Sequence, residues 1–208
     1  RFELRAPQFD PREGVLPGSS IQSLAAALTG KGDREIAEVK GEVAINGQPL
    51  RIEPLRVRLD LPVIRLEALT LIDPQGRGRL NASGEVRLPS EEENQPLSAN
   101  LQLGWQGVQL PKEWVGQPLA TQGELKVTGS LATFEAGGKM TLGPPGKPAD
   151  ITLAITGTPE RIDVKRVAIV QKPGDLTATG HVLLKPQIAW QLSSRATRFD
   201  PGAFVAGW

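Results

Sequence analysis

Apolar and polar residues alternate along most of this 208-residue chain. The clearest examples are the segments 79–88, 97–105 and 175–182, in which every second residue is Leu, Val, Ala, Gly or Trp and the residues between are mostly polar. Successive side chains of a β-strand point to opposite faces of its sheet. The pattern therefore predicts strands with one apolar and one polar face.

Turn-forming sequences separate these segments. Asn46-Gly47, Asp-Pro-Gln-Gly at 73–76, Gly-Pro-Pro-Gly at 143–146 and Lys-Pro-Gly-Asp at 172–175 are examples. Connections this short join antiparallel neighbours. We therefore predict an all-β fold, an elongated antiparallel sheet that follows the order of the chain.

One segment departs from the alternation. Between 19 and 28, Ile21, Leu24, Ala25 and Leu28 have helical spacing, Ser19 or Ser20 could cap the N-terminus, and Gly30 follows the last turn. These features predict one short amphipathic helix near residues 19–28. Such a helix could plug the apolar face as a gate or cap an edge of the sheet, and packing on the sheet is the default expectation.

The chain also repeats itself. Residues 79–88 match 175–184, and Arg65-Leu66-Glu67 matches 161–163, each 96 positions later, whereas 41–47 match 123–129 at 82 positions. A Pro-x-x-x-Val marker occurs at 11–15, 111–115 and 201–205. We predict that residues 1–208 form one continuous β-repeat segment of a longer protein, with units at roughly 11–110 and 111–200 and the start of a third at 201–208.

The segments around these markers, 9–11, 108–114 and 199–208, together with the intervening x-L-x-A-x-G-x-V-x-L strands, resemble the repeats of the TamB family. This family belongs to the AsmA-like group of bridge-like lipid transfer proteins. The resemblance implies a gutter-shaped sheet, or β-taco, with an apolar concave face. It further implies the periplasm of a Gram-negative bacterium, a parent protein anchored in the inner membrane, phospholipid transport to the outer membrane, and outer-membrane protein assembly with the barrel protein TamA. No residue of this chain can be assigned to a TamA contact.

An apolar sheet face must be covered by a second sheet, a helix or a ligand. The residues of this face are mostly small and aliphatic, and interior glycines such as Gly84 and Gly180 would let the sheet curl and leave room for an acyl chain. With the resemblance, this predicts a groove that shields phospholipid acyl chains. The alternative is a structural or adhesive repeat module whose core is sealed by a second sheet and carries no lipid. The candidate groove residues are Val43, Ile45, Leu55, Val57, Leu80, Ala82, Gly84, Val86, Leu101, Leu103, Leu125, Val127, Ile151, Leu153, Ile155, Leu176, Ala178, Gly180, Val182, Ile188 and Trp190.

Charge and composition point away from other functions. The 24 basic and 23 acidic side chains are balanced and scattered, which argues against binding to nucleic acid. The absence of cysteine excludes disulfides, thiolate metal sites and a cysteine nucleophile. His181 is the one histidine and falls on the polar face, and the acidic run 91–93 fits a solvated loop. Known catalytic motifs are missing, so we predict no enzyme, no catalytic residue, no metal and no cofactor. The four tryptophans, which lie near the markers, could line a groove rim or plug the corner of each unit.

Overall fold

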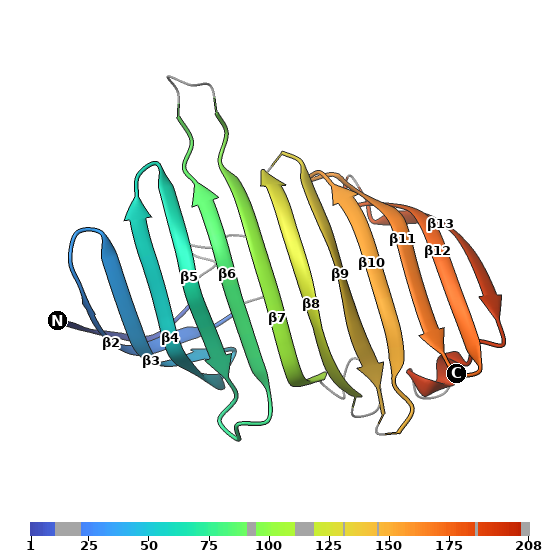
Figure 1. Cartoon of the computed structure of the whole chain (residues 1–208), viewed down its shortest axis with the longest axis horizontal. Coiled ribbons are helices and arrows are strands. Elements are labelled where there is room, and N and C mark those ends of the chain that lie inside the picture. Colours follow the sequence, from blue (N-terminus) through green and yellow to red (C-terminus); the bar gives the residue numbers. More distant parts are fainter. Residues whose placement is uncertain are drawn as a thin grey trace.

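A computed structural model describes residues 1–10, 22–90, 95–110, 119–130, 132–144, 146–185 and 187–204. In this part of the chain, 13 antiparallel strands form one sheet in which each strand pairs with its neighbours in sequence (Figure 1). The described helical structure is the 3₁₀-helix η2 (Pro201–Ala203), whose first amide is capped by Asp200. The predicted all-β antiparallel meander is confirmed. The strands are β1 (Phe2–Phe9), β2 (Leu24–Gly32), β3 (Ile36–Ile45), β4 (Gln48–Asp60), β5 (Val63–Ile72), β6 (Arg79–Arg87), β7 (Ser98–Leu110), β8 (Leu119–Ser130), β9 (Phe134–Gly143), β10 (Ala149–Gly157), β11 (Arg161–Gln171), β12 (Gly174–Leu183) and β13 (Ala189–Thr197).

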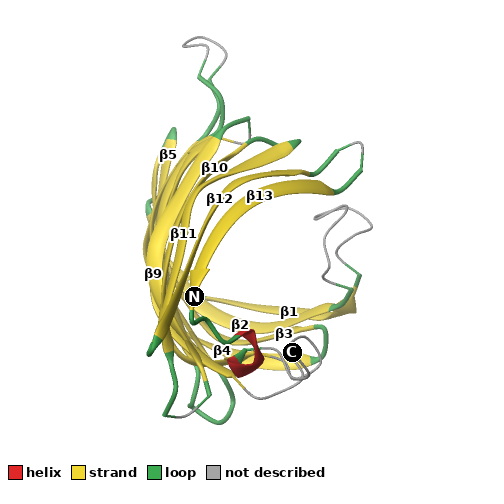
Figure 2. Ribbon diagram, turned by 90° about the vertical axis from the view of Figure 1, so that its right-hand side faces the viewer, coloured by secondary structure: helices red, strands yellow, loops and turns green. Residues whose placement is uncertain are grey.

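The sheet is curved and open. Seen along its long axis, it has a C-shaped cross-section, like a gutter (Figure 2). Its edge strands are β1 and β13, each with one hydrogen-bonded neighbour among the described strands. The strands run across the gutter, and the direction of the inter-strand hydrogen bonds follows its length (Figure 1).

The register of the strands lines up apolar residues across the whole sheet. Directly paired residues of antiparallel strands place their side chains on the same face, so a chain of such pairs defines a row. The first row runs through Phe2, Gly30, Val39, Leu55, Leu69, Ala82, Leu103, Leu125, Gly138, Leu153, Val167, Ala178 and Ser194. The second runs through Leu4, Leu28, Gly41, Ile52, Leu71, Leu80, Trp105, Gly123, Met140, Ile151, Ile169, Leu176 and Ala196. Ser194 is the one polar residue in these two rows, and we call the face that carries them the apolar face.

Bulges keep these rows continuous where the alternation along a strand breaks. The register shifts between Leu66 and Leu69 in β5, between Trp105 and Val108 in β7, and between Val164 and Val167 in β11. A bulge sets two residues of one strand against one of its partner and bends the strand. Repeated along the sheet, these bends account for its curvature.

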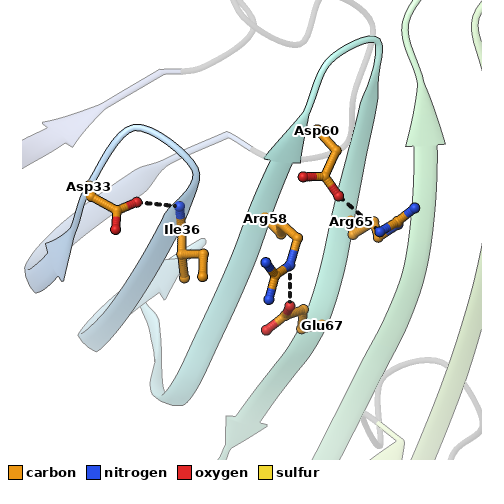
Figure 3. A network of polar contacts seen from close by, with 6 residues as sticks. All are labelled: Asp33, Ile36, Arg58, Asp60, Arg65 and Glu67. Carbon is orange, nitrogen blue, oxygen red and sulfur yellow. Dashed lines mark hydrogen bonds and ion pairs between the residues drawn. The ribbon is translucent and has the colours of Figure 1, made fainter.

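The other face of the sheet is polar and carries ion pairs. Arg58 Nε lies 2.8 Å from a carboxylate oxygen of Glu67, and Arg65 lies 2.8 Å from Asp60 (Figure 3). Near the N-terminal end, Glu38 accepts a 3.0 Å hydrogen bond from Arg56. Exposed pairs of this kind contribute little to stability, because solvent screens them. Their main effect is to keep this face hydrated.

The helix predicted near residues 19–28 is wrong where the structure describes it. Residues 24–28 lie in β2, and 19–21 fall outside the described residues. Leu24, Ala26 and Leu28 alternate toward the apolar face, where they pair with Ile45, Val43 and Gly41 of β3. The apolar residues in 24–28 fit both the helical period and the two-residue period of a strand. Pairing with the neighbouring strand β3 selects the strand. Helical propensity is a weak preference that such tertiary contacts override.

The total surface fits an unsealed sheet. A compact monomer of 22.3 kDa exposes roughly 9,400 Å². This chain exposes 14047 Å², about half as much again. The excess is consistent with a single layer whose two faces both meet solvent.

Aspartates organise two of the turns. Asp33 accepts a 2.8 Å hydrogen bond from the amide of Glu35 and a 2.9 Å hydrogen bond from the amide of Ile36. Figure 3 shows the bond from Ile36. These bonds hold the pKa of Asp33 below its ordinary value. Burial raises the pKa of Asp73, but hydrogen bonds from the Gly78 and Arg77 amides outweigh it, and the net pKa is lowered.

These shifts predict a loss of stability in acid. The pKa of such a carboxyl is lower in the folded state than in the unfolded state, where it is 3.8. The carboxylate therefore stabilises the fold at pH values above 3.8, and this stabilisation is lost as the pH falls through the pKa of the folded state. We expect the thermal unfolding temperature, measured by circular dichroism, to decrease when the pH is lowered below 3.8. The double variant Asp33→Asn/Asp73→Asn should show a smaller fall, and an identical fall would contradict this account of the turns.

Candidate functional site

The apolar face lines the concave side of the gutter. Figure 3 has the same left-to-right order of strands as Figure 1, and it shows Arg58, Asp60 and Glu67 on the viewer's side of the sheet. Figure 2 shows that this side is the convex one. Because the polar residues occupy the convex side, the apolar rows face the hollow of the gutter.

Side chains on the apolar face are only partly covered. Among the described residues, eight hydrophobic residues are buried, and of the two apolar rows only Val39, Ile52 and Ala82 are among them. Most other row residues in the interior strands are half-buried. No second sheet covers this face within the described part of the chain. The face can therefore accept an apolar ligand without unpacking a core.

The register brings the predicted groove residues onto this one face. All of them except Ile188 lie within strands. Ala82 pairs with Leu103, and Gly84 pairs with Leu101, which in turn pairs with Val127. Ile188 precedes β13 and is 79 % exposed, and Trp190 in β13 is 69 % exposed. These two stand at the open edge of the sheet.

The tryptophans have different environments. Trp105 lies on the apolar face, and its indole Nε1 donates a 3.1 Å hydrogen bond to Thr121 Oγ1 in β8, which holds its ring against the neighbouring strand. Trp190 stands at the exposed edge strand. Trp114 and Trp208 fall outside the described residues. Trp105 thus fits a packing role better than a rim role.

Sequence reasoning missed the apolar residues of β5, β9 and β11. In β5 and β11 a bulge interrupts the alternation, so that Leu66 and Leu69, like Val164 and Val167, stand three positions apart. The sequence does carry a signal of each bulge: the apolar residues are spaced two positions apart, then three, then two again. In β9 some residues of the apolar face are alanine or glycine. These residues do not distinguish an apolar face from a polar one. On these three strands, the apolar-face residues that were not predicted include Ile64, Leu66, Leu69, Leu71, Phe134, Ala136, Gly138, Met140, Ile162, Val164, Val167 and Ile169.

Two glycines of the apolar face have matching geometry. Gly84 has φ +140° and Gly180 has φ +145°, and a Cβ at either position would overlap the carbonyl oxygen of Asn100 or Gln191 in the next strand. Both positions therefore require glycine.

The same positions refine the internal comparison. Leu66 pairs with Gly84 and Val164 pairs with Gly180, so the ladder aligns Leu66 with Val164. The sequence match of 65–67 with 161–163 instead aligns Leu66 with Ile162, two residues before Val164. The boundaries of the repeat units stay a prediction.

The chain's one histidine lies on the polar face. His181 pairs with Asp163 and Gln191 on the polar face, as its sequence position indicates. No group of three side chains that could hold a metal ion occurs in the described ranges. The acidic run 91–93 falls outside them. No helix in the described part of the chain is long and apolar enough to cross a membrane.

Comparison with known proteins gives one match. Residues 23–208 match the family described as TamB, N-terminal domain. No curated protein matches the chain, and no solved structure matches it.

The glycine geometry yields a prediction for stability. Gly84→Ala or Gly180→Ala should lower the free energy of unfolding by about 1–3 kcal/mol, because the variant must adopt a strained backbone and displace a carbonyl. Gly104→Ala is the control, since Gly104 lies on the polar face and the nearest atom to its added Cβ is 3.9 Å away. Urea unfolding measures all three variants, and equal losses would contradict the assignment.

Proposed function

Because the chain belongs to the TamB family, we propose that its apolar face carries the acyl chains of phospholipids along the gutter, between the inner and outer membranes of a Gram-negative bacterium. The proposal places this segment in the periplasm, as part of a protein anchored in the inner membrane. It also includes the link to outer-membrane protein assembly with TamA, in which no residue of this chain is given a role. The family is not a known family of enzymes.

The observation that carries the proposal is the continuity of the apolar rows. Two rows cross all 13 strands, so an apolar path follows the whole described length of the sheet. The path lies on the concave side and is only partly covered by protein (Figure 2). A ligand that moves along the sheet needs an apolar path without interruption. A sealed core has no such requirement.

The energy of lipid transfer explains the value of such a path. Burying one methylene is worth about 0.8 kcal/mol, so a chain of about 15 methylenes loses roughly 12 kcal/mol of stabilisation when it enters water. A row of partly exposed aliphatic side chains removes most of this barrier at every point along the sheet. Ser194 at the edge is the one polar residue in the two rows, so few polar groups along them would hold a lipid in place. The polar headgroup stays in water at the open side of the gutter.

The structural-module alternative makes a different demand on the same face. A sealed module needs a second layer over the apolar rows, and the described residues supply none. The exposure of the molecule, 14047 Å², also exceeds that of a compact protein of this mass. These observations favour the gutter.

A charge placed in the gutter tests the proposal. Leu101→Arg places a guanidinium on the apolar face, where its long stem can reach the open side. We expect the variant to keep the circular dichroism spectrum of the wild type and to lose the phospholipid that co-purifies with it, as measured by native mass spectrometry. Asn100→Arg is the matched control, because Asn100 is the exposed neighbour on the convex face, paired with Glu85.

Two results would contradict the proposal. In a sealed core, one unpaired buried charge costs about 3–5 kcal/mol, so Leu101→Arg would unfold while Asn100→Arg stayed folded. A wild-type protein that carries no phospholipid and takes none up from vesicles would also speak against it.

A further inference from the structure

The two rims of the gutter differ in chemistry. Because neighbouring strands run in opposite directions, the β4–β5 and β12–β13 connections lie on one rim, which exposes Leu61, Leu184 and Ile188. Strands β9, β11 and β13 end on the other rim, at the bottom of Figure 1, which we call the lower rim. Exposed Lys147 and Lys172 lie in its turns. A ligand with one apolar and one charged end therefore has a preferred orientation across the gutter.

A hollow of about 430 Å³ lies at the lower rim. It is bounded by the β9–β10 turn, the β11–β12 turn and the segment that follows β13. Lys147 just precedes β10, Lys172 directly follows β11 and Arg198 directly follows β13, so the strand order brings three cations to one place. Asp150 and Asp200 line the same hollow.

These charges surround the hollow without neutralising one another. Within the described residues, none of the three cations forms an ion pair. Asp200 Oδ1 accepts a 3.0 Å hydrogen bond from the Gly202 amide. On the convex face, by contrast, Arg58 and Glu67 pair directly at 2.8 Å. The opposite charges at the lower rim stand around an open space, and a ligand that carries both charges can bridge them.

The hollow adjoins the apolar path. Gln171 lines it and is buried on the apolar face, two residues after Ile169 of the second apolar row. Two strand residues span about 7 Å. From Ile169 the row continues to Ile151 on one side and to Leu176 on the other. A polar headgroup in the hollow therefore leaves its acyl chains within reach of these aliphatic side chains.

We propose that this hollow binds the headgroup of a zwitterionic phospholipid, with the phosphate among Lys147, Lys172 and Arg198 and the ammonium beside Asp150 and Asp200. The inference rests on the proposed lipid-carrying function and adds the headgroup class and its site. Lysine and arginine donate charge-assisted hydrogen bonds to phosphate oxygens. All five side chains are exposed, so each contact is weak and the site orients the lipid without trapping it.

Removing the three positive charges tests the site. In the variant Lys147→Gln/Lys172→Gln/Arg198→Gln the substituted positions are exposed, so the fold should persist, as circular dichroism can verify. The probe is a phosphatidylethanolamine with a fluorophore on its acyl chain, offered in vesicles of phosphatidylethanolamine and phosphatidylglycerol. We expect uptake of the probe to fall by roughly 3- to 10-fold, since three weak charge contacts are lost together. If this variant does not fold, Lys172→Gln alone should show a smaller loss, and no loss would contradict the site.

A matched control loses the same charge on the convex face. Lys126→Gln/Lys139→Gln/Arg195→Gln removes three exposed cations there and should take up the probe as the wild type does. Equal uptake by the wild type and both triple variants would show that the headgroup binds elsewhere although lipid is carried. Equal losses in both triple variants would reveal a general effect of charge and would also overturn the inference.

The carboxylates are tested through the choice of headgroup. We expect the wild type to take up labelled phosphatidylethanolamine in preference to labelled phosphatidylglycerol, which has no ammonium group. Asp150→Asn/Asp200→Asn should lose this preference, while the asparagine at 200 can still cap the Gly202 amide. A preference that is absent from the wild type, or that persists in the double variant, contradicts the role given to the two aspartates.

A soluble headgroup distinguishes lipid from free phosphate. In ¹H–¹⁵N spectra of the wild type, glycerophosphoethanolamine should shift the amide resonances of Lys147, Lys172 and Arg198, and inorganic phosphate should shift them less. Equal shifts from phosphate would make the hollow a phosphate site and overturn the lipid assignment. If the headgroup shifts these amides but the wild type takes up no lipid, the proposed function fails, and the role of the hollow in carrying lipid fails with it.

Discussion

The rest of the structure depends on the ladder of backbone hydrogen bonds that joins each strand to the next. In an antiparallel ladder, paired residues share a face, so register alone decides whether thirteen amphipathic strands present one continuous apolar surface or a patchwork. A slip of one residue in any strand would set polar side chains into the apolar rows. The bulges in β5, β7 and β11 absorb the places where the sequence itself changes phase. Curvature and continuity are thus two results of the same local device.

The strands and the antiparallel meander could be predicted because both depend on short-range information. Alternation over a few residues, together with turn sequences such as Asn46-Gly47, is enough to define a strand and its hairpin. The segment 24–28 could not be decided in this way, because its apolar residues suit a helix as well as a strand and β3 decides between them. The apolar residues around the bulge in β11 were missed for a related reason, since the ladder with β12, and not the sequence of β11, shows that Val164 and Val167 share a face.

The candidate site was predictable in its chemistry more than in its shape. The aliphatic character of the face can be read from residues such as Leu103 and Leu125. That this face is the concave one follows from the direction in which the strands bend, which no residue type states (Figure 2). Phe134 of β9 pairs with Gly157 of β10, where an added Cβ would overlap the phenylalanine ring, and this contact becomes visible only once the register is known. Glycine in a strand usually indicates a bend or close backbone approach, and at 157 it instead makes room for a ring.

The strictly sequential order of the strands has a consequence for how the protein acquires its structure. Each strand pairs with the segment that comes just before or after it, so the main-chain contacts join residues that are near in sequence. Closing short loops costs little chain entropy, and all-β proteins with distant pairings fold slowly because they must close long ones. A sheet of this order can grow hairpin by hairpin from the end of the chain that emerges first. A polypeptide of this kind can therefore begin to fold while it is still being synthesised, before its C-terminal strands have been made.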